Sequence, residues 1–485
     1  GDIPFSGKKI TGLGNGSAAQ DAPTYVQLTA RTVVSVKDPA YAAVGDGVAD
    51  DTTPIQNALN SGADFVLMPD GTYLISAQVT HPTGVTWKGT SRSTVTLFAK
   101  AAVDFQYMVY NSGGTGVNLG DMTIDANQVN RAGALTTTAF CVLFTGVTDS
   151  NVENVIVQNA LGSASLSGVG CAIGGTSTRS NIINCKALNC GTVAKPADGF
   201  FSSSSDSLIA NCTAYNCTDT AFALESCSFS GIVGCISDLC NCGGAITNAI
   251  NTDTYGNYIS GLTIKNWNAS VTGGVQIGHP LNTSTGVLYD TNVSGLTIYA
   301  NTASYGTGAA LYIRSTGTPK ATRVNISGVV IDGASTQGVL VNSGVDVCIN
   351  GGMIRNCANS AIQFAGTSTL GYAQGVRVIC ASTTGISTSN TATAYAVGNF
   401  ISGPSYGIFA FDTSTMVCQM NTIITPTVNY TGKDVGATLT QIGVIGASLS
   451  VSNATGSAPA GALNNKFLVV DASGNNIGYI PTYAS

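Results

Sequence analysis

The chain has 485 residues, only 9% of them charged, and a net charge of −6. Because Lys and Arg are few and scattered, the composition argues against nucleic-acid binding, and because no apolar run approaches the roughly 20 residues of a membrane span, we expect no membrane insertion. Apolar residues make up 44% of the chain, which argues against disorder.

The first segment, residues 1–38, is predicted to be a short neck that precedes the main domain. The prediction rests on residues 6–30, SGKKITGLGNGSAAQDAPTYVQLTA, which lack the patterns found further along the chain. Since the chain begins with Gly rather than Met, we expect that a natural N-terminal segment is missing.

Three aspartates lie within residues 46–51, just ahead of a predicted helix. We expect Thr53 as the N-cap of this helix, Gln56 as the second member of a capping box, and Gly62 beyond its end. Negative charge ahead of a helix interacts favourably with the helix dipole. The helix is expected to cover the open end of a β domain, and the aspartates are interpreted as structural. A bound calcium ion is the alternative, although the EF-hand spacing is absent.

Three segments in the middle of the chain repeat one pattern, and each ends in Cys-x4-Cys. Their first cysteines lie 27 and then 23 residues apart, and a self-similar period of roughly 20–30 residues is typical of a solenoid. Stacked coils are expected to place the cysteines in two interior columns, without disulfides or zinc. The columns are Cys185/Cys212/Cys235 and Cys190/Cys217/Cys240. Many unpaired cysteines also favour assembly in a reducing cytoplasm.

Between these segments, short stretches alternate apolar and polar residues with period two, which predicts strands with one buried face. The apolar positions expected to face the interior are Phe200, Phe222, Leu224, Val275, Ile277, Leu311, Ile313, Val339, Val341, Ile362 and Phe364. Helical signals are nearly absent after residue 62. The predicted fold class is therefore all-β: a right-handed, single-stranded parallel β-helix over residues 39–433, with coils about 4.8 Å apart.

The alternate positions of the same strands are expected to face outward. They form two columns, Phe201, Ala223, Ile246, Gln276, Tyr312 and Leu340, and Ser203, Glu225, Asn248, Gly278, Arg314 and Asn342. Aromatic faces and amides suit sugar rings and hydroxyl groups, so this face is predicted to be a glycan groove; an ordinary solvated ladder is the alternative. The predicted substrate-binding residues are Phe201, Ser203, Asn248, Gln276 and Asn342.

Glu225 is one of only two glutamates in the chain and is a candidate general acid for glycoside cleavage. That chemistry needs a second carboxylate, about 5–5.5 Å away for retention or about 6.5–9.5 Å away for inversion. Asp198 and Asp219 precede adjacent strands and lie 21 residues apart, so either could provide it, as could a neighbouring subunit. The simpler interpretation is that both aspartates form turns and that Glu225 is a solvated acid.

His279, Tyr312 and Arg314 form a second candidate catalytic cluster on consecutive coils. They suit β-elimination from a uronic-acid sugar, in which Arg314 would neutralise the sugar carboxylate and His279 or Tyr312 would move the proton. The alternative is that His279, followed by Pro280, marks a loop and that Arg314 bonds to carbonyl groups. Hydrolysis and elimination therefore both stay open.

Residues 45–75 resemble the entry to pectate-lyase-like β-helix proteins, notably bacteriophage tailspikes. The matching positions are Gly45, Asp46, Gly47, Asp50, Asp51, Thr52, Ile55, Gln56, Pro69, Gly71 and Tyr73. Residues 8–28 are similar to the trimeric necks of phage fibres and adhesins, and residues 478–483 are similar to tailspike endings. The motif marks the fold, and the catalytic residues of the family vary too much to be carried over.

The resemblance implies a homotrimeric phage tailspike that binds and depolymerises a bacterial surface polysaccharide, either a capsular exopolysaccharide or an O-antigen. It implies a small C-terminal β domain over residues 434–485, for trimerisation or carbohydrate binding, and attachment to the phage baseplate or tail through the missing N-terminal segment. The protein is then expected in the virion, acting outside the host cell after assembly in the host cytoplasm. We expect no cofactor and no metal. A receptor-binding protein that recognises the polysaccharide without cutting it is the alternative function.

Overall fold

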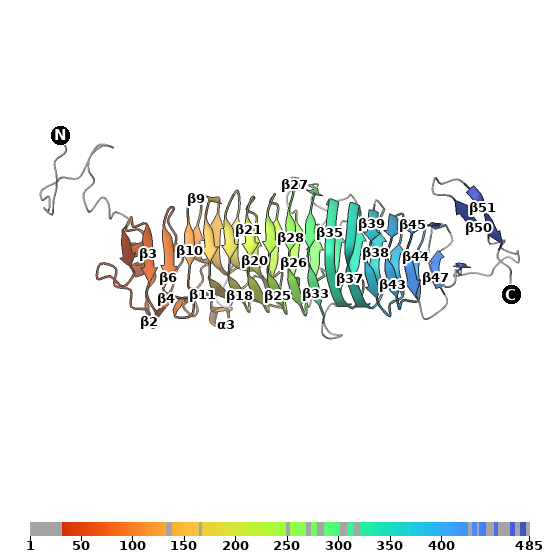
Figure 1. Ribbon diagram of the computed structural model, residues 1–485. Coiled ribbons are helices and arrows are strands. Elements are labelled where there is room, and N and C mark those ends of the chain that lie inside the picture. Colours follow the sequence, from red (N-terminus) through yellow and green to blue (C-terminus); the bar gives the residue numbers. More distant parts are fainter. Residues whose placement is uncertain are drawn as a thin grey trace, which may run out of the picture.

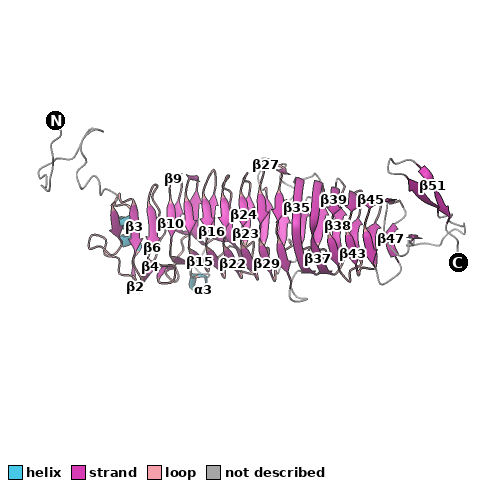
Figure 2. Cartoon of the chain, in the orientation of Figure 1, coloured by secondary structure: helices cyan, strands magenta, loops and turns pink. Residues whose placement is uncertain are grey.

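The computed structural model shows an elongated solenoid in which short strands wind as successive coils of a parallel β-helix (Figure 1). In the part of the chain that the structure describes, the helices are α2 (Thr52–Leu59) and α3 (Gln128–Arg131), and strands make up the rest of the regular structure (Figure 2). The predicted all-β, right-handed parallel β-helix is confirmed. The structure describes residues 32–131, 138–163, 167–248, 253–267, 273–278, 286–300, 308–314, 321–367, 369–424, 429–433, 436–442, 451–453, 466–470 and 476–481.

Each coil contributes strands to three columns that run along the solenoid. The first column, which we call the groove sheet, consists of β5 (Val79–Thr80), β8 (Tyr107–Asn111), β12 (Phe140–Thr145), β16 (Gly168–Gly174), β20 (Lys195–Ser202), β23 (Phe222–Glu225), β26 (Gly244–Thr247), β30 (Val275–Ile277), β34 (Leu311–Arg314), β36 (Val339–Asn342), β38 (Ser360–Ala365), β41 (Thr384–Thr388), β44 (Tyr406–Ala410), β47 (Asn429–Lys433) and β49 (Val451–Asn453). Neighbouring strands of this sheet pair in parallel, residue for residue.

The other two columns close the coil. The second consists of β1 (Val33–Ser35), β3 (Phe65–Met68), β6 (Thr86–Gly89), β10 (Asn118–Gly120), β14 (Asn151–Glu153), β17 (Asn181–Ile183), β21 (Leu208–Ala210), β24 (Gly231–Val233), β28 (Tyr258–Ser260), β32 (Asn292–Ser294), β39 (Leu370–Gln374), β42 (Thr393–Val397), β45 (Thr415–Gln419) and β48 (Thr438–Ile442). The third consists of β2 (Asp46–Asp50), β4 (Gly71–Ile75), β7 (Val95–Ala99), β11 (Thr123–Asp125), β15 (Ile156–Gln158), β18 (Lys186–Leu188), β22 (Thr213–Tyr215), β25 (Ile236–Asp238), β29 (Thr263–Lys265), β33 (Thr297–Tyr299), β40 (Arg377–Ile379), β43 (Phe400–Ser402) and β46 (Thr422–Ile424).

The remaining strands extend or decorate these columns. The long strands β35 (Ala321–Ala334) and β37 (Gly344–Cys357) serve the second and third columns together. The others are β9 (Gly114–Thr115), β13 (Val147–Thr148), β19 (Gly191–Thr192), β27 (Thr254–Tyr255), β31 (Leu288–Tyr289), β50 (Lys466–Val470) and β51 (Asn476–Pro481). Of these, β19 turns back on β20 as an antiparallel hairpin, and β50 pairs with β51 in the same way.

The interior of the solenoid is filled by the apolar positions that the period-two pattern predicted. All eleven of these predicted inward side chains are buried, and Phe200 stacks on Phe222 of the next coil with ring centroids 5.6 Å apart. Burial of such side chains supplies roughly 25 cal/mol for each Å² of apolar surface removed from water. The coil is therefore stable because the inward positions of successive strands coincide.

The two predicted cysteine columns are interior stacks. Cys185, Cys212 and Cys235 follow one another on adjacent coils, and the backbone N–H of Cys185 lies 3.4 Å from the sulfur of Cys212. All 14 cysteines are free thiols, and every one except Cys348 is buried. Burial raises the pKa of the Cys227 thiol to about 12, which suits a small apolar core residue rather than a nucleophile.

One corner of the coil is turned by residues in the left-handed backbone conformation. Each donates its N–H to the carbonyl that precedes the equivalent residue of the next coil. The column runs Asp121, Asn154, Asn184, Asn211, Gly234, Gly261, Gly295 and Gly328, with φ between 53° and 66°. Asp, Asn and Gly are the residues that adopt this conformation at least cost, so the corner explains part of the chain's richness in Asn and Gly.

The helix at the N-terminal end, α2, begins two residues earlier than predicted. Its N-cap is Asp51, and the first intrahelical bond runs from the N–H of Ile55 to the carbonyl of Asp51, so the prediction of Thr53 as N-cap is wrong. Gln56 does not complete a capping box. Its side chain instead exchanges two hydrogen bonds with the main chain of Thr80 in β5, and so satisfies backbone groups at the first strand of the groove sheet.

The three aspartates ahead of α2 bind main-chain N–H groups. The buried carboxylate of Asp51 accepts hydrogen bonds from Val44 at 2.7 Å and from Gly45 at 3.0 Å. The carboxylates of Asp46 and Asp50 accept hydrogen bonds from N–H groups two or three residues further on. Among the described residues, no group of three or more His, Cys, Asp or Glu side chains is arranged to hold a metal ion.

One predicted strand register is wrong by a single residue. In β26 the side chains of Ala245 and Thr247 belong to the outward columns and Ile246 is buried inside, whereas the sequence pattern placed Ile246 and Asn248 outward. The cause is Gly244, which occupies an inward position where a Cβ would lie 2.8 Å from Leu262. A one-residue slip exchanges the two faces of a strand.

The ends of the chain are described only in part. Residues 1–31 of the predicted neck lie outside the described residues, and β1 already pairs with β3 at residues 33–35. Parallel pairing also continues beyond residue 433, where β48 pairs with β45 and β49 with β47. Much of the predicted C-terminal unit, residues 434–485, is outside the described residues. Within the part that is described, no helix has the length and apolarity to cross a membrane.

The cysteine stacks predict the reactivity of the thiols. In the native protein only Cys348 should react with a thiol reagent such as Ellman's reagent, because the other cysteines are buried. After unfolding in guanidinium chloride without reductant, all 14 thiols should react. A smaller number in the unfolded protein would mean that disulfides are present.

The bonds of Asp51 predict that it stabilises the N-terminal end. Asp51→Ala removes the acceptor of two partly buried N–H groups, and we expect a loss of about 1–3 kcal/mol in the free energy of unfolding, measured with denaturant. Asp46→Ala is the matched control, because water can replace its exposed carboxylate. Equal losses for the two variants would contradict a special role for Asp51.

Candidate active site

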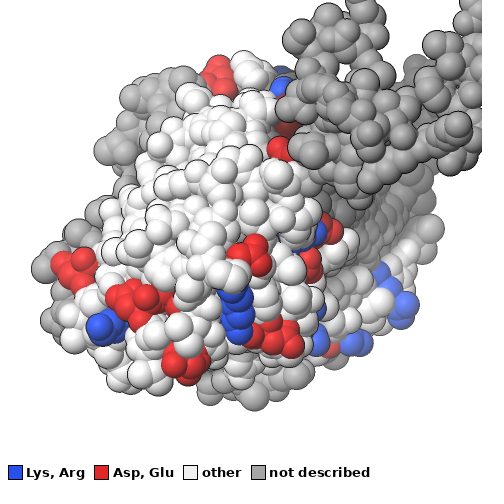
Figure 3. All heavy atoms as spheres, turned by 90° about the vertical axis from the view of Figure 1, so that its left-hand side faces the viewer, with Lys and Arg blue, Asp and Glu red and all other residues white. Residues whose placement is uncertain are grey.

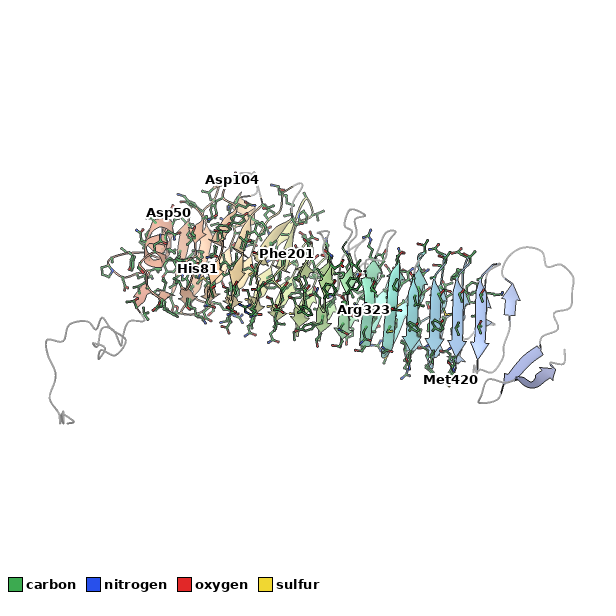
Figure 4. All side chains as sticks on the ribbon, turned by 90° about the horizontal axis from the view of Figure 1, so that it is seen from above. Asp50, His81, Asp104, Phe201, Arg323 and Met420 are labelled. Carbon is green, nitrogen blue, oxygen red and sulfur yellow. The ribbon has the colours of Figure 1, made fainter. Side chains whose placement is uncertain are left out.

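A cavity of about 590 Å³ opens on the outward face of the groove sheet. It extends over the coils that contain β12, β16, β20, β23, β26 and β30, and Phe201, which lines it, is labelled in Figure 4. The lining residues are Phe140, Leu143, Ser167, Val169, Ala172, Asp198, Phe201, Asp219, Thr220, Ala223, Glu225, Ala245, Thr247 and Gln276.

Strand register places the floor of this cavity. Phe201, Ala223, Ala245 and Gln276 pair in succession across β20, β23, β26 and β30, so their side chains form one outward column. The two alanines leave room above the sheet beside the ring of Phe201. The floor is therefore apolar and low, with one aromatic ring standing on it.

A local kink in β20 turns both Asp198 and Phe201 toward the cavity. Between them, Phe200 is buried in the core, and a Cβ on Gly199 would stand 3.2 Å from both Ala187 and the sulfur of Cys217, which are interior groups. Two consecutive residues therefore face inward, and the residues on either side of them face outward, as in a β-bulge. Glycine is required at the kink because there is no room for a side chain.

Asp198 has the most perturbed carboxyl group of the cavity. Burial raises its pKa well above the ordinary value, and the negative charges of Asp219 and Glu225 raise it further. The N–H of Thr220, which donates to Oδ1 of Asp198 at 2.8 Å, opposes this only in part. The raised pKa of Asp198 favours its protonated form, which is the form that a general acid needs.

The other two carboxylates are held by hydroxyl groups. Ser167 donates from Oγ to Oδ2 of Asp219 at 2.6 Å, and the main-chain N–H of Asp219 donates to the carbonyl of Ala197. Thr247 lies beside Glu225 in the next strand, with Oγ1 at 3.4 Å from Oε2. Three carboxyl groups thus share one cavity, and burial, with the charges of the other two, raises the pKa of Asp198.

The structure brings together five of the residues that the sequence predicted for the site. Asp198, Asp219, Glu225, Phe201 and Gln276 all line the cavity. Their assigned roles in catalysis or substrate binding remain predictions.

The other predicted site residues lie elsewhere. Asn248 is buried and does not line the cavity, because the predicted register of β26 was wrong by one residue. Thr247 takes the position beside Glu225. Ser203 is not among the lining residues. Tyr312, Arg314 and Asn342 lie further along the groove sheet, on β34 and β36. His279 is outside the described residues, so its predicted role cannot be placed.

Sequence reasoning did not identify Ser167 and Thr220, which bind the two aspartates. Ser and Thr are abundant in the chain, so residue type gave no signal for either. Thr220 was nonetheless detectable in principle, because it follows Asp219 directly.

Comparisons with known proteins agree with this architecture. Residues 33–268 match the family model described as rhamnogalacturonase A/epimerase, pectate lyase-like, which confirms the resemblance to pectate-lyase-like β-helices. The catalytic unit of a thermostable GH87 α-1,3-glucanase from Streptomyces thermodiastaticus is similar over 90% of this chain and 70% of its own, with 15% identity and a TM-score of 0.55. Pre-mature bacteriophage phi29 gene product 12 is similar over 87% and 73%, with 15% identity and a TM-score of 0.52.

These similarities concern the fold. At 15% identity a shared fold does not transfer an activity, because one fold hosts many functions. No curated protein sequence matches the chain. The function has to be argued from the cavity itself.

The raised pKa of Asp198 predicts how stability depends on pH. Below the unfolded-state pKa, about 3.9, Asp198 is protonated in both states and has no effect. As pH rises above that value the unfolded state loses this proton and the folded state keeps it, so the folded state is progressively destabilised. Asp198→Asn cannot ionise. The difference between its melting temperature and that of the wild type should therefore increase from about pH 3.5 to about pH 7.

Thermal melts followed by circular dichroism test this pH dependence. Asp206→Asn, which removes the charge of an exposed aspartate on another turn, corrects for the general effect of losing one negative charge. A difference between Asp198→Asn and wild type that stays constant over this pH range would show that Asp198 ionises normally in the folded state.

Proposed function

We propose that this pectate-lyase-like β-helix is a phage tailspike that binds a bacterial surface polysaccharide, a capsular exopolysaccharide or an O-antigen, and hydrolyses its glycosidic bonds. The observation that carries the proposal is the cavity in which Asp198, whose pKa is raised by burial, lies with Asp219 and Glu225. Glycoside hydrolysis needs one carboxylic acid and one carboxylate on either side of the scissile bond.

The geometry supports a division of roles among the carboxyl groups. Asp198 protonates the leaving glycosidic oxygen, since its raised pKa favours the protonated form. Asp219 or Glu225 activates water in an inverting reaction or attacks the sugar in a retaining one. Ser167 holds the carboxyl group of Asp219 in place, with its Oγ donating to Oδ2 at 2.6 Å. Phe201 presents an apolar ring against which the sugar face can pack.

Hydrolysis is favoured over β-elimination by the charges in the cavity. Elimination from a uronic-acid sugar needs a cation to neutralise the sugar carboxylate. Among the residues that the structure describes, the cavity lining contains three carboxyl groups and neither Lys, Arg nor His. A uronate at the point of cleavage would be repelled, so the sugar at the scissile bond is neutral.

The phage assignment rests on the sequence resemblance to tailspikes and is supported by the fold shared with the phi29 protein. A tailspike acts from the virion on the outside of the host cell. Homotrimerisation and attachment to a baseplate or tail through an N-terminal segment belong to the same proposal. The fold shared with the GH87 α-1,3-glucanase supports a carbohydrate-active role.

Incubation with purified capsular polysaccharides and O-antigens tests the activity. We expect discrete oligosaccharides with new reducing ends and without the ultraviolet absorbance of unsaturated uronates. Binding with unchanged chain length would mean a non-catalytic receptor-binding protein, and unsaturated products would mean a lyase.

Variants of the carboxyl groups test the proposed roles. Asp198→Asn should lower kcat by about a hundredfold or more, the usual contribution of acid–base catalysis. A loss of the same order is expected from Asp219→Asn or from Glu225→Gln, and the variant that shows it identifies the second catalytic carboxylate. Glu153→Gln is the control for glutamate loss, because Glu153 is the chain's other glutamate and lies on the second column. The wild-type rate should fall as pH rises through the raised pKa of Asp198, because the deprotonated acid cannot donate. Full activity of Asp198→Asn would exclude it as the acid.

A further inference from the structure

Arg314 lies in the same outward column as Glu225. Glu225 in β23 pairs with Thr247 in β26. Gly278 takes the same position on the following coil and lies beside Arg314 in β34. Arg314 in turn pairs with Asn342 in β36. Glu225 and Arg314 are therefore three coils apart, roughly 14 Å at about 4.8 Å for each coil. A negative and a positive group thus lie on one straight line along the groove sheet.

The outward positions between Glu225 and Arg314 carry mostly small side chains. The outward positions there are held by Ala223, Ala245, Thr247, Gln276 and Gly278. Gln276 is buried, and its Nε2 donates to the carbonyl of Gly278 at 2.8 Å. Rings stand in the neighbouring column at both ends, Phe201 in β20 and Tyr312 in β34. The cavity lining reaches Gln276 in β30, and Tyr312 and Arg314 lie on the next strand of the groove sheet, β34.

The guanidinium of Arg314 has no carboxylate partner among the described residues. It lies 5.6 Å from the centre of the Tyr312 ring, a cation–π distance. Three other described arginines pair with an aspartate one coil away: Arg179 with Asp149, Arg323 with Asp290, and Arg355 with Asp332. Two more, Arg92 and Arg131, bond to main-chain carbonyls, and Arg377, like Arg314, lies over an aromatic ring. The residues beside Arg314 in its column are instead Gly278 and Asn342, which carry no charge. Charged residues make up only 9% of the chain, and at the N-terminal end acidic and basic side chains lie close together (Figure 3).

We propose that Arg314, with Tyr312 and Asn342, forms a subsite for an anionic group of the polysaccharide, and that the substrate is an acidic heteropolysaccharide cleaved at a neutral residue. The inference rests on the proposed function, because it places this subsite relative to the cleavage site. A guanidinium binds carboxylate or phosphate through paired N–H donors, and an aromatic ring below it holds its plane in place. Three carboxyl groups at one end and a guanidinium at the other also fix the direction in which the chain lies.

The anionic group can be a sugar carboxylate or a phosphate ester, and chemical modification of the polymer distinguishes them. An acidic polysaccharide that the protein cleaves is compared with its carboxyl-reduced form and with its dephosphorylated form. For the wild type, removing the correct group should lower kcat/KM by about tenfold or more, the usual worth of a charge-assisted hydrogen bond. Arg314→Gln should show the same loss on the native polymer and little further loss on the modified one.

Arg377→Gln is the matched control for this experiment. Arg377 lies 5.5 Å from the centre of the Phe400 ring, but on the third column rather than on the groove sheet, so its replacement should leave the ratio between native and modified polymer unchanged. Circular dichroism confirms that each variant is folded. Binding without cleavage is measured by electrophoresis in gels that contain the native polymer. The retention of Asp198→Asn is compared with that of Asp198→Asn/Arg314→Gln.

Two results would overturn the inference and leave the proposed function intact. One is cleavage restricted to neutral polysaccharides, and the other is an equal loss for Arg314→Gln on native and modified polymers. Absence of cleavage of every polysaccharide would instead count against the proposed function. In that case the gel experiment tests the subsite by itself. Binding to the acidic polymer that is lost when Arg314 is replaced would support the subsite, and binding that is unchanged would refute it.

Discussion

The structure depends on hydrogen-bonded ladders between coils that keep equivalent residues in register. Strands such as β23, β26 and β30 have only three or four residues and could not persist alone, but each is bonded to the coil before it and the coil after it. Because side chains alternate along a strand, one shared register fixes the interior and the surface together. The stacked core phenylalanines and the outward column from Phe201 to Gln276 are two results of the same pairing.

Much of this organisation was predictable from the sequence because the ladder repeats itself. Positions such as Phe200, Phe222 and Leu224 carry a period-two signal, and the Cys-x4-Cys spacing marks columns of coils without any knowledge of their neighbours. The failures occurred where residue type is ambiguous. Gly244 has no apolar side chain to mark an inward position, so Ile246 was assigned to the wrong face. Asp51 and Thr53 are both good N-caps by type, and the hydrogen bonds that the Asp51 side chain accepts from Val44 and Gly45 distinguish the two.

The candidate site was predictable to a smaller extent, and for a different reason. Sequence spacing indicated that Asp198 and Asp219 lie on adjacent coils, and scarcity drew attention to Glu225. It did not reveal the kink at Gly199 that turns Asp198 outward, nor Ser167, which comes from a separate coil. Three carboxyl groups in one partly buried cavity are unfavourable for folding, and a framework stabilised by long ladders can tolerate that cost. The site is thus an example of local electrostatic strain held in place by a regular scaffold.

The uniform rise of the coil sets a constant distance between equivalent residues on successive coils of the groove sheet. Groups placed on one outward column can be separated only by whole multiples of about 4.8 Å. Gain or loss of a single coil between β23 and β34 would change the distance between Glu225 and Arg314 by about 4.8 Å and leave both side chains facing the same way. A β-helix can therefore adapt to polymers with a different spacing between charge and cleavable bond by changing its number of coils, without rebuilding either end of the site.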